Sequence, residues 1–210
     1  QIANEYLLKG DKTKALELYR ELSKSESNIP FIHNNYINVL LDLGKYDEAQ
    51  SYLKKAIKQD PKNLQYRLDV GLTMTRAGDE SKADKYFREL ISENKDNVQR
   101  VKLISDYFLS RSLTDYGILT LTESRIALGS PSLFCLDLAM LYRVKGNQDK
   151  MVQEYLSYVT QSAANIQYVK NVLQTLLTKQ EELESLEKHL YDKVQQYPDV
   201  EVYADLLIWV

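Results

Sequence analysis

Four of the seven glycines of this 210-residue chain fall on a single lattice. Gly10, Gly44 and Gly78 follow one another at intervals of 34 residues, and Gly146 lies two further intervals along the chain. A constant period of this length indicates a repeat architecture in which each repeat is a pair of helices joined by a turn. Such a chain grows by stacking repeats, so its length does not fix a number of globular domains.

The lattice divides the chain into consecutive repeats when each glycine is taken as the fifteenth residue of its repeat. The division predicts one solenoid over residues 1–210, with partial repeats at both ends: 1–29, 30–63, 64–97, 98–131, 132–165, 166–199 and 200–210. The seventh and eleventh positions are apolar or aromatic in each of six repeats. The seventh position holds Ile2, Tyr36, Val70, Ile104, Leu138 and Val172, and the eleventh holds Tyr6, Leu40, Met74, Phe108, Tyr142 and Leu176. These columns predict a continuous core along one face of each first helix.

The second helix of a repeat places a small residue one turn before a large one. Ala49 precedes Leu53, and Ala83 precedes Phe87. The small residue lets two helices approach closely, and the large one fills the space beside it. This pattern predicts two packed helices in each repeat.

The lattice glycine lies between the two helices, where a helix commonly ends on a left-handed residue that glycine adopts without strain. Ser112 and Gln180 stand where two of these glycines would be, so we expect either strain of roughly 1 kcal/mol or a different turn geometry there. In repeat 166–199 the apolar stripe of the second helix runs through Leu186 and Leu190, one residue later than the columns require. We interpret this shift as a one-residue insertion.

The repeats resemble the tetratricopeptide repeat. Repeat 30–63 carries the residues of that signature at Tyr36, Leu40, Gly44, Tyr46, Ala49, Leu53, Ala56 and Pro61. Repeat 64–97 is similar to it through Gly71, Gly78, Ala83 and Phe87. Residues 98–199 are degenerate, and their assignment depends on the unbroken period and on the apolar columns. The chain is identified as a member of this family, and we expect it to be a fragment of a longer array. The resemblance implies an all-α fold, a right-handed α-solenoid of stacked antiparallel helix pairs.

The resemblance also implies a non-catalytic scaffold whose first helices line a concave groove. Such a groove binds a peptide, a helix or a loop of a protein partner. The groove positions of the family fall on Asn34, Asn38, Leu41, Leu68, Leu72, Arg76, Lys102, Asp106, Leu136, Met140, Arg143, Lys170 and Gln174.

Two groups of these residues admit alternative interpretations. Asn34 and Asn38 lie one helical turn apart, where their amides either hold the backbone of a ligand or are solvated. Leucine and methionine on an open face require cover. Either a partner or the neighbouring first helices then bury Leu68, Leu72, Leu136 and Met140.

Some members of the family bind a C-terminal carboxylate through a clamp of lysine, asparagine and arginine side chains. Asn4 and Asn35 occupy the asparagine positions of that clamp, but Gln65 and Asp69 occupy cationic ones. We expect Asp69 to repel a carboxylate, so the sequence predicts that this clamp is absent.

Composition excludes several other functions. A net charge of −3 without an ordered basic ladder argues against a nucleic-acid partner. Cys135, His33 and His189 are the only cysteine and histidines, and they form no metal-ligand or catalytic pattern. We therefore expect no catalytic residue, no metal and no cofactor, with Cys135 buried in the core. No apolar run approaches the roughly 20 residues that cross a bilayer, so we expect no direct membrane insertion.

The ends of the chain lead to further expectations. Because the chain starts at Gln1, its compartment stays open: we expect a soluble protein that is cytoplasmic or, after removal of a signal peptide, bacterial periplasmic. The final segment, residues 203–210, is strongly apolar, so we expect self-association through the incomplete last repeat. Beside the scaffold, the alternative function is a regulatory or substrate-presenting arm of a larger enzyme or of a secretion or assembly apparatus.

Overall fold

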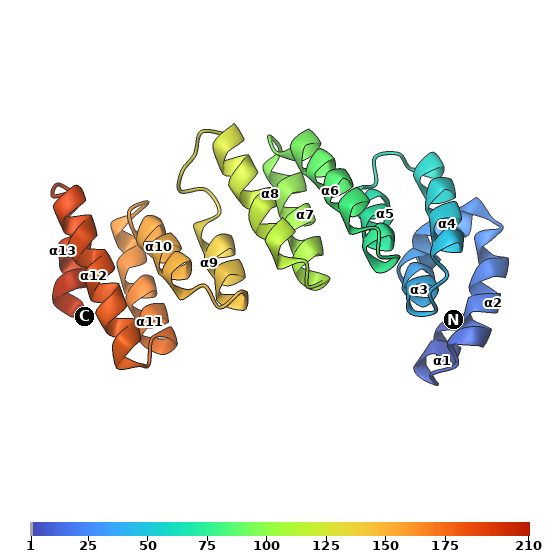
Figure 1. Ribbon diagram of the computed structural model, residues 1–210, viewed down its shortest axis with the longest axis horizontal. Helices are drawn as coiled ribbons and strands as arrows, with labels where there is room; N and C mark the ends of the chain where they lie inside the picture. Colours follow the sequence, from blue (N-terminus) through green and yellow to red (C-terminus); the bar gives the residue numbers. More distant parts are fainter. Residues whose placement is uncertain (1) are drawn as a thin grey trace. The chain divides into compact units, whose positions relative to one another are not determined.

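The computed structural model describes residues 2–210, and within them the chain forms thirteen α-helices and two short 3₁₀ helices, with no β-strand (Figure 1). The fold is therefore an all-α helical repeat. The chain divides into two compact units, one ending at Glu93 and the other beginning at Asn94, and each is described by itself.

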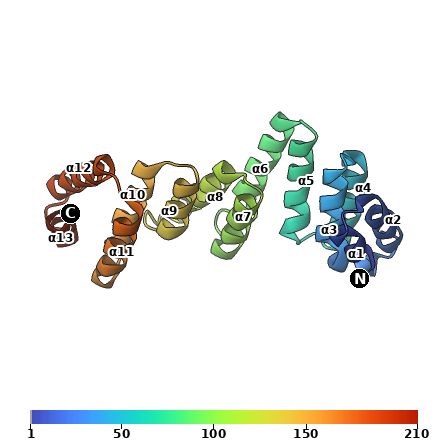
Figure 2. The same cartoon turned by 90° about the horizontal axis from the view of Figure 1, so that it is seen from below.

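The first unit contains three helix pairs, with α1 and α2 packed beside α3 and α4 (Figure 2). Its helices are α1 (Ile2–Leu8), α2 (Lys12–Ser23), α3 (Ile29–Asp42), α4 (Tyr46–Gln59), α5 (Leu64–Arg76) and α6 (Glu80–Asn94), with a 3₁₀ turn at Glu26–Asn28. The last residue of α6 is counted with the second unit.

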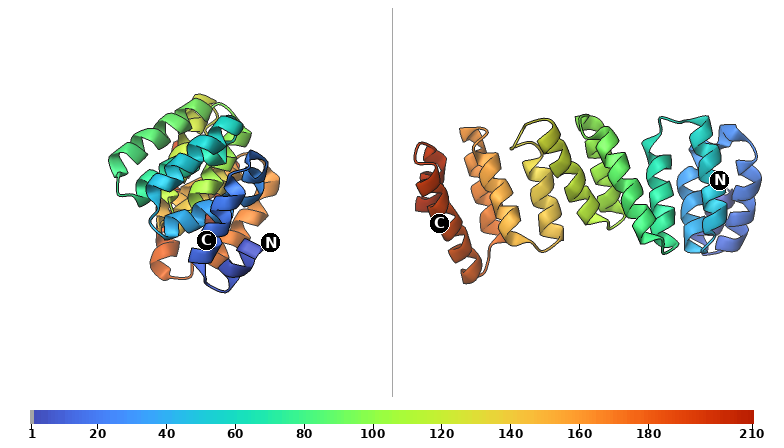
Figure 3. Two further views of the ribbon diagram at one scale, coloured as in Figure 1. Left: turned by 90° about the vertical axis from the view of Figure 1, so that its right-hand side faces the viewer. Right: turned by 45° about the horizontal axis from the view of Figure 1, so that its top comes forward.

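The second unit contains three further pairs and a final helix (Figure 3). Its helices are α7 (Val98–Ser110), α8 (Thr114–Ala127), α9 (Cys135–Val144), α10 (Gln148–Val159), α11 (Ile166–Leu176), α12 (Gln180–Gln196) and α13 (Glu201–Trp209), with a 3₁₀ turn at Ala163–Asn165. The α7–α8 and α9–α10 pairs pack side by side, and α13 packs against α12.

The turns between paired helices follow the prediction. Gly10, Gly44, Gly78 and Gly146 all have a positive φ, between 66° and 85°. After α3, the Lys45 N–H donates to the Leu40 carbonyl at 2.8 Å, which satisfies one of the carbonyls at the helix end. Glycine is thus required here by backbone conformation, since a side chain would meet no atom within 4 Å.

The two positions without glycine behave differently from each other. Ser112 adopts the left-handed conformation with a φ of 58°, so this turn keeps its geometry at the cost of strain. At the other position the geometry changes: α11 ends at Leu176, Leu177 is extended, and Gln180 already belongs to α12. The other first helices, α1, α3, α5, α7 and α9, continue two repeat positions further.

The shifted register of α12 is confirmed by burial. Leu186 and Leu190 are 1% and 0% exposed, whereas Ser185 and His189 remain partly exposed. An insertion of one residue therefore rotates α12 so that its leucines reach the core.

A close approach of two helices determines the packing of the α5–α6 pair. Gly71, in the middle of α5, lies directly against the ring of Phe87 on α6, and a Cβ at Gly71 would stand 2.2 Å from Phe87 Cε1. Phe87 is fully buried as a result. This contact pairs a small residue of the first helix with a large one of the second, whereas the pattern expected from the sequence placed Ala83 and Phe87 on the same helix.

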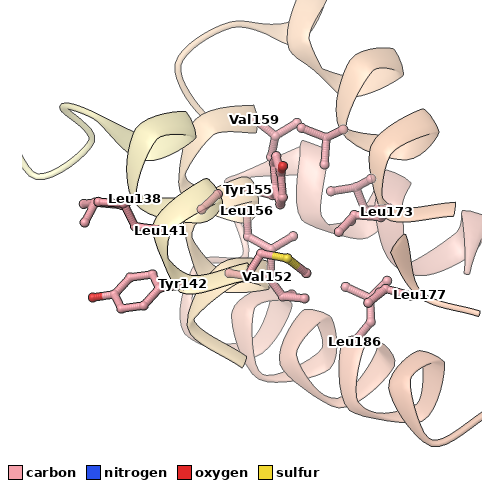
Figure 4. Packing of buried hydrophobic residues seen from close by; sticks show 14 of the residues in the cluster. Leu138, Leu141, Tyr142, Val152, Tyr155, Leu156, Val159, Leu173, Leu177 and Leu186 are labelled. Atoms are coloured by element: carbon pink, nitrogen blue, oxygen red, sulfur yellow. The ribbon is translucent and has the colours of Figure 1, made fainter. Parts of the chain in front are cut away.

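The core of the second unit is a continuous apolar cluster to which α7 to α13 contribute, and Figure 4 shows part of it. Leu138 and Leu156 are 0% exposed within α9 and α10, and Leu173 and Leu186 reach the same cluster from α11 and α12. Leu177, although outside a helix, is 3% exposed and also belongs to it.

A buried ion pair anchors the loop that precedes α9. Arg125 on α8 forms two hydrogen bonds to the carboxylate of Glu154 on α10, at 2.9 and 2.8 Å, and its Nε donates to the Leu133 carbonyl at 2.8 Å. Cys135 lies beside this pair and is 2% exposed, as expected. Burial, followed by the charge of Glu154, raises the pKa of the Cys135 thiol to about 11. The thiol is therefore a packing group with little thiolate character at neutral pH.

We predict that Gly71→Ala destabilises the protein by about 1–3 kcal/mol, because the added methyl group overpacks the Phe87 site. Gly117→Ala on α8 is the matched control, since its Cβ would meet Leu141 Cδ1 at 3.4 Å, an ordinary contact. Alanine is also favoured over glycine inside a helix by about 1 kcal/mol. Urea unfolding should move the midpoint down for Gly71→Ala and leave it equal or higher for Gly117→Ala; a midpoint unchanged by Gly71→Ala would contradict the contact.

Candidate partner-binding site

The predicted groove residues of the first unit divide into exposed and buried ones. Asn34 and Arg76 are exposed, and Asn38 is half-buried. Leu41, Leu68 and Leu72 are 8%, 0% and 3% exposed, so the folded chain itself covers them. Their assignment to a partner-binding surface is corrected on this ground. The sequence left open whether a partner or the neighbouring first helices bury Leu68 and Leu72, and in the structure the chain buries both without a partner.

The asparagines of the first unit make contacts within the chain. The amide oxygen of Asn34 accepts a hydrogen bond from Gln65 Nε2. Asn35 Nδ2 donates to Asn4 Oδ1 at 2.9 Å. The same Asn4 oxygen accepts from the Tyr19 hydroxyl. These amides therefore join neighbouring helices.

Asp69 does not face a groove, and the expectation that it repels a ligand carboxylate is wrong. Its side chain is 0% exposed and lies 2.7 Å from Nε2 of His33, whose own side chain is 4% exposed. The pair connects α5 to α3 inside the first unit. A buried carboxylate needs such a partner, because burial without one is costly.

Aromatic rings enclose this buried pair. The His33 ring stacks on Tyr52 at 5.6 Å and lies 4.3 Å from the ring of Tyr66, measured between centroids. Nδ1 of His33 is 3.3 Å from the Tyr52 hydroxyl. Burial, followed by the charge of Tyr66, raises the pKa of Tyr52 well above its usual range. The cluster thus fixes α3, α4 and α5 together by packing and polar contacts.

A second polar contact extends this network towards the surface. Glu48 on α4 accepts two hydrogen bonds from Arg20 on α2, both 2.7 Å long, and one from the Tyr36 hydroxyl at 3.1 Å. The Arg20 hydrogen bond lowers the pKa of Glu48. Burial and the neighbouring Glu48 charge raise the pKa of Tyr36 to about 12. Three first-unit helices are therefore joined through one carboxylate.

In the second unit most of the predicted groove residues reach the surface. Lys102, Asp106, Met140, Arg143 and Gln174 are exposed, and Leu136 and Lys170 are half-buried. Their surroundings differ. Lys102 is held by Asp137 at 2.7 Å, and Lys170 lies over the Trp209 ring at 5.8 Å from its centroid.

Helix α9 presents an apolar stripe. Met140 is 45% exposed and Val144, one turn later, is 59% exposed, while Leu136 one turn earlier packs partly on the core cluster. In the family that the repeats resemble, the groove is lined by the second, fifth, ninth, twelfth and thirteenth positions of a repeat. Val144 is the thirteenth residue of its repeat, and Phe31, which is 87% exposed in the first unit, is the second of its repeat. Both therefore occupy groove positions, although the predicted set omits them.

A hollow opens beside this stripe, between the end of α9, α10 and α11. It has a volume of about 430 Å³, and its lining includes Arg143, Tyr168, Asn171, Val172, Thr175 and Leu176. A second hollow of about 270 Å³ shares Arg143, Thr175 and Leu176 with it and continues towards Met151 and Thr178. We call the two together the α9–α11 hollow.

The floor of the α9–α11 hollow includes residues at two repeat positions that are fully buried in repeat 98–131. Val172 and Leu176 occupy the seventh and eleventh positions, yet both are only half-buried. The corresponding residues of repeat 98–131, Ile104 and Phe108, are 0% exposed. In repeat 64–97, Val70 and Met74 at the same positions are also half-buried, although α5 extends to Arg76.

The groove residues predicted from the sequence do not include the polar side chains of α11 that line the hollow. Asn171 and Thr175 directly follow the predicted Lys170 and Gln174 on α11, and Tyr168 precedes Lys170 by two residues. These three residues line the hollow, whereas Lys170 and Gln174 do not. The sequence carries one signal for them, the loss of the lattice glycine at Gln180, which marks the repeat whose turn is altered.

Other kinds of site find no support in the residues that the structure describes. Within residues 2–210 no three His, Cys, Asp or Glu side chains gather where they could hold a metal ion. None of the helices in this range has the length and apolar character needed to cross a membrane. The acidic start of α12 is explained by capping, since Glu182 accepts from the N–H groups of Thr178 and Lys179 at 2.9 and 3.0 Å.

The chain consists of stacked helix pairs with a repeat of 34 residues, and its first helices carry exposed side chains. These properties define a helical-repeat protein with the features of a binding scaffold. Residues 40–105 match the tetratricopeptide repeat model. A TPR repeat-containing protein of Methanocaldococcus jannaschii is 25% identical over 164 residues, which cover 78% of this chain and 29% of that protein. The chain thus spans about three-tenths of the length of this relative. These matches and this fold support a protein of the tetratricopeptide repeat family, whose repeats generally mediate protein–protein interactions and are typically non-catalytic.

We predict that Asp69→Ala destabilises the protein by about 3–5 kcal/mol, because it leaves His33 buried without its partner. Asp42→Ala is the control: Asp42 also pairs across helices, with Lys12 at 2.7 Å, but both side chains are about half exposed. An exposed pair of this kind contributes about 0–1 kcal/mol. Chemical unfolding measures both. The double variant His33→Leu plus Asp69→Leu should lose less than Asp69→Ala, and equal small losses for Asp42→Ala and Asp69→Ala would contradict the buried pair.

Proposed function

We propose that the chain is a non-catalytic scaffold that binds a protein partner on the first helices of its second unit. The observation that carries the proposal is the exposed apolar stripe of α9, Met140 and Val144, next to the α9–α11 hollow. Apolar side chains exposed beside a concavity and rimmed by polar groups are typical of protein interaction surfaces.

The rest of the predicted groove supplies the polar rim in this proposal. Lys102, Asp106, Lys170 and Gln174 carry charges and amides around the stripe. Rim groups of this type set orientation and association rate more than affinity. In the first unit, Asn34, Asn38 and Arg76 are the remaining candidates for contacts with the same or another partner.

The alternative is that the chain forms a regulatory or substrate-presenting arm of a larger enzyme or of a secretion or assembly apparatus. The short coverage of the Methanocaldococcus jannaschii relative, 29% of its length, is consistent with a chain that works within a larger protein. Both versions use the same surface, so one experiment on that surface serves both.

We predict that Met140→Glu plus Val144→Glu abolishes partner capture, because charge replaces the apolar anchors at the centre of the surface. Loss of such anchors costs about 2 kcal/mol or more of binding free energy. Affinity capture from a lysate of the source organism, followed by identification of the recovered proteins, makes the comparison with the unsubstituted chain. Ile126→Glu on α8 is the control, since Ile126 is 75% exposed on a second helix. Equal recovery by the double variant would place the binding surface elsewhere.

Self-association through α13 is proposed on a separate observation. Ile208 is 86% exposed and Val210 is 42% exposed, while Tyr203 and Leu206 of the same helix are buried. The exposed side of α13 carries the acidic Glu201 and Asp205 as well as Ile208, so the apolar area that a second copy would cover lies around Ile208 and Val210.

We predict that Ile208→Lys reduces self-association, because a charged side chain is costly to bury against a second copy. Sedimentation velocity over a range of protein concentrations measures the effect. The control Ile126→Lys makes the same change at another exposed isoleucine and should associate like the unsubstituted chain. A concentration-independent monomer for all three proteins would remove this proposal.

A further inference from the structure

The α9–α11 hollow carries one unpaired charge. Arg143 is the only charged residue among those described that line either part of the hollow. It is exposed, and within residues 2–210 it forms no ion pair and no hydrogen bond. Another arginine of the second unit, Arg125, is paired with Glu154.

The surroundings of Arg143 would strengthen its attraction for an anion. Its neighbours in the hollow are the aromatic rings of Tyr155 and Tyr168 and the apolar side chains of Val172 and Leu176. A guanidinium beside low-dielectric walls interacts more strongly with a carboxylate than one in open water. No acidic residue lines the hollow to compete for it.

The hollow also offers a donor for a peptide backbone. Asn171 Oδ1 accepts from Gln167 Nε2 at 2.8 Å, which leaves the Nδ2 group of the same amide as a donor. The Thr175 hydroxyl donates to the Asn171 backbone carbonyl at 2.8 Å, within α11. An amide donor beside a cation fits an extended chain that presents a carbonyl and a carboxylate.

We propose that the α9–α11 hollow binds an extended acidic segment of the protein partner, with a glutamate or aspartate side chain on Arg143 and an adjacent apolar side chain over Val172 and Leu176. The carboxylate comes from a side chain within the segment, because the hollow continues on both sides of Arg143 and leaves a path for the chain in both directions. This inference rests on the proposed function, since it assigns a chemistry to the partner of the same surface.

The experiment uses the whole chain and three short peptides observed by amide NMR titration. The first is acetyl-Gly-Ser-Leu-Glu-Leu-Ser-Gly-amide, the second replaces its glutamate by glutamine, and the third is the glutamine peptide with a free C-terminal carboxylate. We expect millimolar binding of the glutamate peptide, with shifts at residues of α9 and α11, and about tenfold weaker binding of the second and third, the worth of one charge-assisted hydrogen bond at a partly exposed site.

Variants connect the effect to Arg143. Arg143→Gln should remove the preference for glutamate, and Arg143→Glu should reverse it in favour of a peptide with lysine in place of glutamate. Arg88→Gln is the control, because Arg88 is an exposed arginine on α6 that already pairs with Asp84 at 2.8 Å; it should bind like the unsubstituted chain.

Three results would overturn the inference: no shifts with the glutamate peptide at millimolar concentration, equal binding of the glutamate and glutamine amides, or selective binding of the free C-terminus. None of these bears on the Met140 and Val144 surface. If partner capture still depends on Met140 and Val144 while the peptides fail, the proposed function stands and the acidic segment is excluded.

Discussion

The turn between the two helices of a repeat is the constraint on which the rest of the structure depends. A left-handed residue at the fifteenth position ends the first helix and starts the second at a fixed place, so the apolar columns of both helices face each other. Where glycine supplies that conformation, the turn carries no steric cost. Where Ser112 supplies it, the same geometry survives with strain, and the core of that repeat remains closed, as the full burial of Ile104 and Phe108 indicates.

The two units solve the problem of joining successive repeats differently. In the first unit a polar cluster lies inside the packing, with His33 and Asp69 between the rings of Tyr52 and Tyr66. In the second unit the large cluster contributed by α7 to α13 is apolar, and the ion pair of Arg125 with Glu154 holds a loop instead. Removing one partner of a buried pair is strongly destabilising, because the other partner is left without compensation. The packing of the first unit therefore depends on keeping both His33 and Asp69.

Much of the fold could be predicted from the sequence, because period and helix geometry are linked. The glycine lattice predicts the position of the turns, and the apolar stripe through Leu186 and Leu190 predicts the register shift of α12. The depth of burial could not be predicted in the same way. A repeat position tells which side of a helix a residue occupies, but the cover over Leu68 and Leu72 comes from residues distant in sequence. Asp69 was misplaced for the same reason, since its partner His33 lies 36 residues away.

The hollow on the second unit combines a local irregularity of the repeat with half-open apolar side chains. With Gln180 in place of glycine, α11 ends at Leu176, two repeat positions earlier than the other first helices. The apolar side chains of Val172 and Leu176, whose counterparts Ile104 and Phe108 are fully buried, are half-open beside Arg143. Incomplete cover costs stability, because apolar area stays in water, and a partner that buries this area would recover that free energy on binding. Val70 and Met74 are half-buried as well, in a repeat that keeps its glycine, so what distinguishes the α9–α11 hollow is that its apolar area lies next to Arg143.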